Sequence, residues 1–145
     1  MRTACLVILL AVQVSLFAQD AEVKALASKE ECRALCDGVM KAIAGGQVGG
    51  GFAALRPYWV FSPKDFADYQ IKTIQKMTSV TPTYGKVVGW EFVRQDAAGE
   101  SLLRLTYLHK FERHALGWVF IFYKPRDQWL LNEFRWDEEL ERVFE

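Results

Sequence analysis

Four runs of β-branched and aromatic residues follow one another between Lys86 and Trp136, and they constrain the fold more than any other feature of the chain. The runs are KVVGWEFV, SLLRLTYLHKFE, ALGWVFIFYK and WLLNEFRW, and the segments between them are DAAG, RH and KPRDQ. These runs suit a pleated surface, and the short segments carry residues typical of turns. Short turns join antiparallel neighbours. The sequence therefore predicts a four-stranded antiparallel meander.

The lengths of the turns predict which residues lie opposite one another in this sheet. With RH as a two-residue turn, His109 lies opposite Trp118. With DAAG as a four-residue turn, Glu91 lies opposite Arg104 and forms a cross-strand ion pair with it. With KPRDQ as the last loop, Phe120 lies opposite Asn132.

Side chains alternate between the two faces of a strand, so the runs divide into a core face and an outer face. The predicted core face carries Val88, Trp90, Phe92, Leu103, Leu105, Tyr107, His109, Phe111, Leu116, Trp118, Phe120, Phe122, Leu130, Asn132, Phe134 and Trp136. The outer face has an apolar centre that no predicted helix covers, and such an area is usually covered. We therefore expect a homodimer with an interface that contains Leu108, Val119, Ile121, Tyr123, Trp129 and Leu131.

Helical patterns precede the sheet. From about Glu30, apolar residues recur at spacings of three and four and predict an amphipathic helix that buries Cys32, Cys36, Val39 and Ile43. The glycine-rich segment AGGQVGGG is interpreted as a flexible connection, and a short helix follows over residues 52–59. Ser62 and Pro63 then start a longer helix that continues to about Met77. Helices followed by a meander predict an α+β fold with a single domain over residues 19–145.

The first residues have the pattern of an export signal. Arg2 is followed by the apolar run ACLVILLAVQVSLFA, which Gln13 and Ser15 interrupt. The run is too short and too interrupted for a membrane span, so we expect a cleavable signal peptide over residues 1–18. An uncleaved anchor is the alternative. The expected location is periplasmic in a Gram-negative bacterium and secreted otherwise.

The composition limits the classes of partner. The chain has 145 residues, of which 51% are hydrophobic and 25% charged, and its 18 basic residues match its 18 acidic ones. A chain of this length can bury a sizeable core in one domain. Without a basic surplus we expect no nucleic-acid partner and no attachment to an anionic membrane.

Cys32 and Cys36 remain after removal of the signal peptide. They lie one turn apart on the predicted helix, which is a poor geometry for an unstrained disulfide. We interpret them as small core residues, with a local or intermolecular bridge, or metal or redox chemistry, as alternatives. Neither a histidine nor a second cysteine pair accompanies them, so no metal and no cofactor is predicted.

The predicted order of elements resembles the nuclear-transport-factor-2-like (cystatin-like, SnoaL-like) superfamily. The resemblance rests on the helix from Glu30, the capped helix from Ser62 and the meander from Gly89 onwards. More narrowly, YLHKFERHALGW and FYKPRDQWLLNEF resemble a family of exported bacterial proteins with no assigned activity. The resemblance implies a strongly curved sheet that wraps around a helix as a cone. It does not imply one function, because the superfamily hosts isomerases, dehydratases, binding modules and dimerisation domains.

Few polar residues are available for chemistry inside such a cone. The resemblance implies that an enzyme of this kind would place a carboxylate, or a histidine with an acidic partner, there. The predicted core face offers only Tyr107, His109 and Asn132. We therefore expect an exported non-catalytic binding or interaction module with a small apolar ligand, held by Tyr107, His109, Trp118, Phe120 and Asn132. The alternative is a lyase or isomerase with His109 as general base, which a helix carboxylate such as Asp65 or Asp68 beside His109 would favour.

Overall fold

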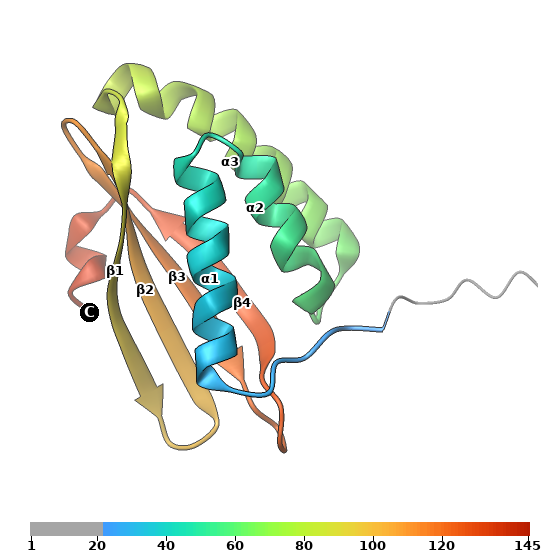
Figure 1. Cartoon of the computed structure of the whole chain (residues 1–145). Helices are drawn as coiled ribbons and strands as arrows, with labels where there is room; N and C mark the ends of the chain where they lie inside the picture. The colour runs from blue at the N-terminus through green and yellow to red at the C-terminus, as the bar shows by residue number, and fades with distance from the viewer. Residues whose placement is uncertain (1–21) are drawn as a thin grey trace, which may run out of the picture.

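Three helices precede a four-stranded sheet in the computed structural model, which describes residues 22–145 (Figure 1). The elements are α1 (Lys29–Ala44), α2 (Val48–Leu55), η1 (Arg56–Tyr58), α3 (Pro63–Tyr84), β1 (Val87–Ala98), β2 (Leu102–Phe111), β3 (Ala115–Tyr123), β4 (Leu130–Asp137) and η2 (Leu140–Val143). This order confirms the predicted α+β class. The predicted signal peptide lies outside the described residues. Within residues 22–145, no helix combines the length and apolar character that crossing a membrane requires.

Helix α1 forms where its apolar periodicity predicts it. The side chain of Ser28 accepts a hydrogen bond of 3.1 Å from the amide of Glu31 and so caps the first turn. The buried stripe contains the predicted residues and also Met40. Cys32 and Cys36 are free and fully buried, as expected of small core residues. Burial raises the pKa of Cys32 to about 12, so this thiol is unreactive at neutral pH.

Helix α2 begins at Val48, inside the glycine-rich segment that was predicted to be a flexible connection. That prediction was wrong, because the segment from Val48 is helical and its Gly51 serves packing. A Cβ atom added at Gly51 would lie only 2.8 Å from Cγ1 of Ile43 on α1. Glycine therefore lets the two helices approach closely, and this packing outweighs a helix-propensity cost of ~1 kcal/mol per glycine.

Helix α3 continues to Tyr84, beyond the predicted end near Met77. A stripe along one face of α3 runs from Phe66 through Thr73 to Tyr84, and its members are buried or packed against the core. They are Phe66, Tyr69, Thr73, Met77, Val80 and Tyr84. Burial of this extension outweighs the weak helix propensity of the threonine-rich segment that precedes Gly85. Gly85 ends the helix with a φ of 90°, a conformation that favours glycine.

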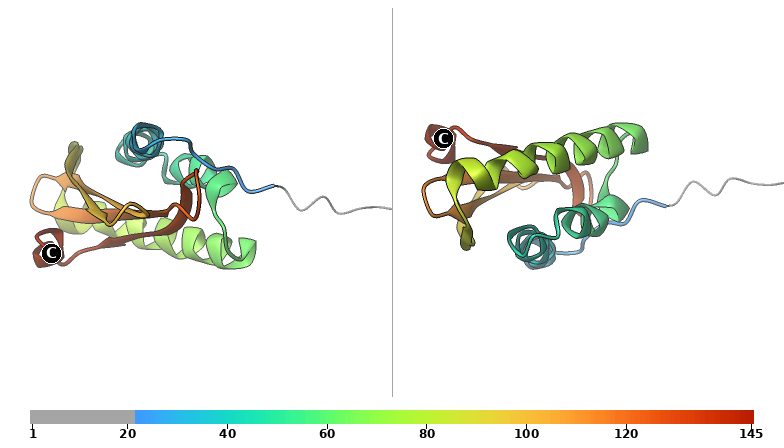
Figure 2. Two further views of the ribbon diagram at one scale, coloured as in Figure 1. Left: turned by 90° about the horizontal axis from the view of Figure 1, so that it is seen from below. Right: turned by 90° about the horizontal axis from the view of Figure 1, so that it is seen from above.

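The strands form an antiparallel meander in the order β1-β2-β3-β4. Helices α1 and α2 lie against one face (Figures 1 and 2). Helix α3 runs along the β4 side, where Trp136 Nε1 donates a hydrogen bond of 3.1 Å to Thr73 Oγ1. The sheet is open, with β1 and β4 as its edges, and the strong cone-like curvature implied by the resemblance stays a prediction.

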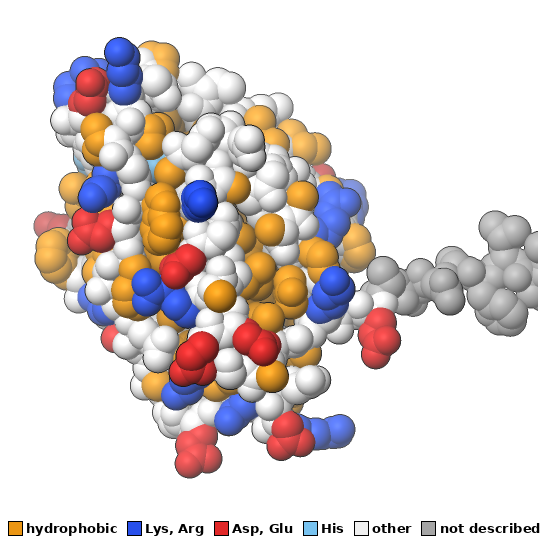
Figure 3. Space-filling view, viewed as in Figure 1, with side chains coloured by type: hydrophobic (Ala, Val, Ile, Leu, Met, Phe, Trp, Pro, Cys, Tyr) orange, Lys and Arg blue, Asp and Glu red, His pale blue; other side chains and the backbone are white. Residues whose placement is uncertain are grey.

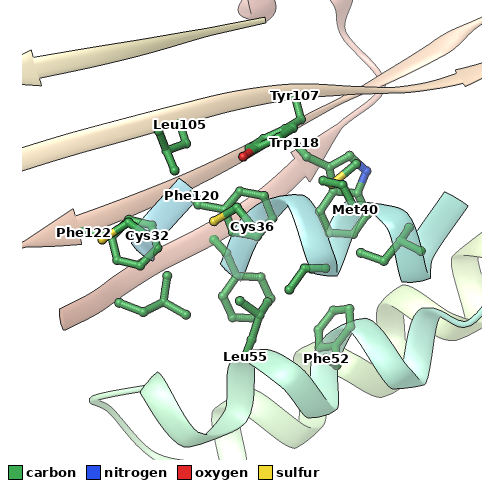
Figure 4. Packing of buried hydrophobic residues seen from close by; sticks show 14 of the residues in the cluster. Cys32, Cys36, Met40, Phe52, Leu55, Leu105, Tyr107, Trp118, Phe120 and Phe122 are labelled. Atoms are coloured by element: carbon green, nitrogen blue, oxygen red, sulfur yellow. The ribbon is translucent and has the colours of Figure 1, made fainter. Parts of the chain in front are cut away.

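The core lies between the sheet and helices α1 and α2. Every predicted core residue of β2 and β3 is buried. Figure 4 shows Cys36 and Met40 of α1 close to the aromatic side chains of the sheet, such as Phe120, with Phe52 and Leu55 of α2 beside them. The alternation of side chains therefore predicted the buried face of the two central strands correctly.

The predicted register between β2 and β3 was wrong by two residues. His109 lies opposite Leu116, and Tyr107 lies opposite Trp118. The turn spans residues 111–114 and is closed by a hydrogen bond of 2.9 Å from the amide of Phe111 to the carbonyl of His114. Because the shift is even, each side chain stays on the face that was predicted.

The predicted register between β1 and β2 was also wrong. Strand β1 continues to Ala98, so the turn is residues 99–101 and Glu91 lies opposite Leu108. The proposed Glu91 pair with Arg104 does not form; Arg104 instead pairs with Asp96 at 3.1 Å. A bulge between Val87 and Gly89 leaves Val88, a predicted core residue, 60% exposed.

A bulge in the β3–β4 ladder changes which residues of β4 face the core. The pairing shifts between Ile121 and Phe122, so Phe120 lies opposite Phe134 and not opposite Asn132. Residues on the N-terminal side of the bulge change faces as a result. Trp129 and Leu131, predicted on the outer face, are buried, whereas Leu130 and Asn132, predicted in the core, are partly exposed.

The close approach of α1 and α2 is testable with two adjacent glycines. We expect Gly51→Ala to destabilise the protein by ~1–3 kcal/mol, because the new methyl group overlaps Ile43. The control is Gly50→Ala, where the nearest atom, Cβ of Gln47, lies 3.6 Å away; we expect this change to stabilise α2 by up to ~1 kcal/mol. Urea unfolding followed by circular dichroism measures both. Equal effects of the two changes would contradict the packing role of Gly51.

Candidate ligand pocket around His109

A hollow of about 350 Å³ lies where α1 ends, α2 begins and the second half of α3 passes the end of β2. Its volume falls within the range of small-molecule sites. It is lined by Ile43, Gly46, Val48, Gly49, Ile74, Met77, Thr78, Thr81, Val87, His109 and Phe111. We call it the His109 pocket.

Two glycines keep this pocket open. A Cβ atom added at Gly46 would meet no atom within 4 Å, and one added at Gly49 would meet only Nε2 of Gln70 at 3.9 Å. Gly46 also has a φ of 81°, which suits the reversal between α1 and α2. The glycine-rich segment, interpreted from sequence as a linker, therefore forms part of the pocket wall.

His109 is a buried polar group without a partner. Its side chain is 3% exposed, and neither ring nitrogen has a hydrogen-bond partner within residues 22–145. Its closest aromatic neighbour is the ring of Phe111, with 4.4 Å between the centroids. Burial lowers the pKa of His109 from 6.5 to about 4, so the imidazole is neutral at pH 7. A neutral imidazole offers one N–H donor and one nitrogen acceptor.

Tyr107, also predicted to bind a ligand, is instead bound to helix α1. Its hydroxyl donates a hydrogen bond of 2.8 Å to Asp37, which also accepts a bond of 2.7 Å from Arg33 Nε. The guanidinium of Arg33 lies 3.3 Å from the ring centroid of Phe92. Burial is the main cause that raises the pKa of Tyr107. This cluster joins α1 to β1 and β2.

Asp37 is an acid that reaches the core face and was not predicted from the sequence. The signal was present, because Asp37 follows the buried Cys36 and stands four residues after Arg33, the spacing of a helical ion pair. Only the packing of α1 on the sheet shows that its carboxylate meets Tyr107.

The other predicted ligand residues do not line the His109 pocket. Trp118 and Phe120 are fully buried and stack on each other, with 6.4 Å between ring centroids. The indole N–H of Trp118 has no partner in the described part of the chain. Asn132 lies at the β4 bulge. Of the five residues predicted to hold a ligand, the pocket therefore contains only His109.

The carboxylates proposed to reach His109 lie elsewhere. Asp65 and Asp68 belong to the exposed start of α3, where Lys64 holds the pKa of Asp68 below its usual range. Residues that line the pocket include no Asp or Glu. Between residues 22 and 145, no cluster of three His, Cys, Asp or Glu side chains could hold a metal ion.

The C-terminal segment covers part of the outer face of the sheet. Val143 lies so close to Gly117 that a Cβ atom there would be 2.8 Å from it, and Arg104 donates a hydrogen bond of 2.9 Å to the carbonyl of Glu145. Thr106, on the same face, is only 1% exposed. The predicted dimer interface thus loses Trp129 and Leu131 to the core and retains only Leu108, Val119, Ile121 and Tyr123.

Comparisons with protein-family models, with curated proteins and with solved structures found no match. The resemblance described above therefore stays a prediction.

The homodimer also stays a prediction, and one substitution tests it. In a dimer through the retained patch, Ile121→Asp would place a charge in an apolar interface, so we expect it to yield a folded monomer. The control is Ile71→Asp, on a 54% exposed position of α3, which leaves a dimer intact. Light scattering at micromolar concentration measures the mass. A monomeric wild-type protein would contradict the predicted dimer.

The pKa of His109 predicts how stability depends on pH. The unfolded chain binds more protons than the folded one between pH 4 and 6.5, so His109 contributes stability above about pH 6.5 that is lost as the pH falls through about 4. A shift of this size corresponds to roughly 3 kcal/mol. Urea unfolding at pH 7 and at pH 4 measures the decrease in the free energy of unfolding. We expect this decrease to be smaller in His109→Phe than in the wild type by about the same amount.

The control for that experiment is His114→Asn, which removes the other histidine of the described chain. If the stability of His109→Phe falls with pH as steeply as that of the wild type, the imidazole is not buried in its neutral form.

Proposed function

We propose that this chain is an exported, non-catalytic binding module that holds one small, mainly apolar ligand in the His109 pocket. The observation that carries the proposal is His109 itself: a 3% exposed imidazole that lines a pocket, with both ring nitrogens unpaired in the described structure. Both nitrogens are shielded in the free protein, so a ligand bonds to them after a small movement of the pocket wall. A buried polar group left without a partner costs ~1–3 kcal/mol, and a ligand that bonds to it recovers that energy. Proteins usually pair such groups, so this one is a candidate contact.

The remaining wall residues indicate the chemistry of the ligand. Six of them are apolar: Ile43, Val48, Ile74, Met77, Val87 and Phe111. No lysine, arginine, aspartate or glutamate lines the pocket, so a charged ligand would lose its hydration without gaining a counter-ion. The neutral imidazole and the hydroxyl of Thr81 can bond to an uncharged polar group. The hydroxyl of Thr78 donates a hydrogen bond of 2.6 Å to the carbonyl of Gln75, so it can only accept one from a ligand. A phenol or an alcohol with a compact hydrocarbon part meets these conditions.

The surface supports small-molecule binding over binding to a polyanion. Basic, acidic and hydrophobic side chains are interspersed over the face shown in Figure 3. The formal net charge of the chain is zero. A nucleic-acid partner would require a concentrated basic surface.

The alternative function, a lyase or isomerase with His109 as general base, is less well supported. A general base is most effective when its pKa lies near the working pH. Burial lowers the pKa of His109 to about 4, and no acidic residue of the pocket wall is available to raise it. The same neutral imidazole is well suited to hydrogen bonding without proton transfer.

A titration with 4-ethylphenol tests the proposal, since this probe combines a small apolar body with one hydroxyl. We expect it to raise the melting temperature of the wild type, whereas ethylbenzene, which lacks the hydroxyl, should bind at least tenfold more weakly. His109→Phe should reduce the affinity for the phenol to that for ethylbenzene. Isothermal titration calorimetry measures the affinities.

Two glycine variants provide a matched control for the site. Gly49→Leu adds a side chain at the pocket wall, where the backbone leaves room, and should abolish binding of the phenol. Gly50→Leu adds the same side chain one residue away, outside the pocket lining, and should retain binding. Equal binding by both variants would place the probe elsewhere and contradict the proposal.

A further inference from the structure

A second hollow, of about 550 Å³, lies near the start of α3. Its apolar wall contains Trp59, Phe61 and Phe66, together with Pro57 and Pro63. The His109 pocket meets α3 from Ile74 onwards, so the two hollows are separated by about 12 Å along the helix. We call this second hollow the Trp59 pocket.

The wall of the Trp59 pocket is held by hydrogen bonds. The amide of Lys24 donates a bond of 2.8 Å to the carbonyl of Pro57, which fixes the segment before α1 against η1. The indole N–H of Trp59 donates a bond of 3.2 Å to the carbonyl of Ser62. The rings of Trp59 and Phe61 meet edge to face, with 5.4 Å between their centroids. The aromatic wall is therefore formed before any ligand binds, which lowers the entropic cost of binding.

The aromatic wall is nevertheless open to solvent. Phe61 is 56% exposed, and Val23, which also lines the pocket, is 40% exposed. A large apolar side chain at such exposure gains free energy when a ligand covers it. The wall therefore favours a flat, apolar molecule.

The charged residues of the Trp59 pocket indicate the charge of the ligand. Lys24 and Arg56 line it, against one acid, Glu22. Neither cation forms an ion pair with any described residue; the only side-chain hydrogen bond of Arg56 is one of 3.4 Å to Gln70. The Arg56 guanidinium lies 5.6 Å from the ring centroid of Phe66, so a cation adjoins the aromatic wall. An anionic group placed there would meet charge-assisted hydrogen-bond donors.

We propose that the Trp59 pocket binds a small aromatic anion, whose rings lie against Trp59, Phe61 and Phe66 and whose carboxylate or sulfonate meets Arg56 and Lys24. This site differs from the His109 pocket in place and in the charge it accepts. It gives the chain a second, independent binding function.

Two matched dyes test the proposal. 8-Anilinonaphthalene-1-sulfonate carries one sulfonate, and N-phenyl-1-naphthylamine has the same rings without it. We expect the double variant Lys24→Gln, Arg56→Gln to bind the sulfonate at least tenfold more weakly than the wild type does. Its affinity for the neutral dye should lie within twofold of the wild-type affinity. The control Lys41→Gln, Lys72→Gln makes the same change of charge away from the pocket and should bind both dyes like the wild type. Fluorescence titration of the folded proteins measures the affinities.

Two further measurements locate the dye. In a ¹H–¹⁵N spectrum, the indole N–H signal of Trp59 should shift as the sulfonate saturates the protein. Phe61→Ala should lower the affinity of the protein for both dyes. His109→Phe, which changes the wall of the His109 pocket, should leave the sulfonate affinity unchanged. Three outcomes would overturn the proposal: equal sulfonate affinity in the two double variants, an unmoved Trp59 signal at saturation, or loss of sulfonate binding in His109→Phe. None of these outcomes depends on whether 4-ethylphenol binds beside His109.

Discussion

The packing of α1 on the core face of β2 determines the rest of the structure. Near Tyr107, α1 supplies the carboxylate of Asp37, which accepts a hydrogen bond of 2.8 Å from the Tyr107 hydroxyl. Two residues later on the same face, His109 meets the end of the helix, where Ile43 and the following glycines line the pocket and supply no polar side chain. Tyr107 therefore has a hydrogen-bond partner, whereas His109 has none among the described residues. The reason is that α1 supplies the carboxylate of Asp37 near Tyr107 but the apolar side chain of Ile43 near His109. The unpaired imidazole is a consequence of where α1 ends.

The same contact explains the glycine-rich segment. Gly51 allows α2 to pack closely on α1 at Ile43, while Gly46 and Gly49 add no side chain to the pocket that His109 also lines. One short segment therefore both brings the helices together and opens the pocket. At the other end of α3, the Trp59 pocket is built from aromatic residues and carries two cations, Lys24 and Arg56, that form no ion pair within residues 22–145. The fold therefore presents two hollows of different chemistry.

Local patterns in the sequence predicted local structure well. The stripe Cys32, Cys36, Val39 and Ile43 and the buried faces of β2 and β3 follow from periodicity, which depends only on helix and strand geometry. Features that depend on distant contacts were not predictable in this way. The bulges near Val88 and Asn132 exchange the faces of their neighbours, and nothing in the alternating pattern marks them. For the site, His109 could be named from its place on the core face, but its pocket required the positions of three helices.

Nitrogen NMR of the His109 imidazole, recorded with and without 4-ethylphenol at pH 7, tests the central claim most directly. Our account predicts a neutral ring without a strong hydrogen bond in the free protein, since burial lowers its pKa and the described residues offer it no partner. It also predicts that the signals of the ring nitrogens move on saturation with the phenol, as the imidazole gains a hydrogen bond. Ring nitrogen signals that stay unchanged while the phenol binds would contradict the account.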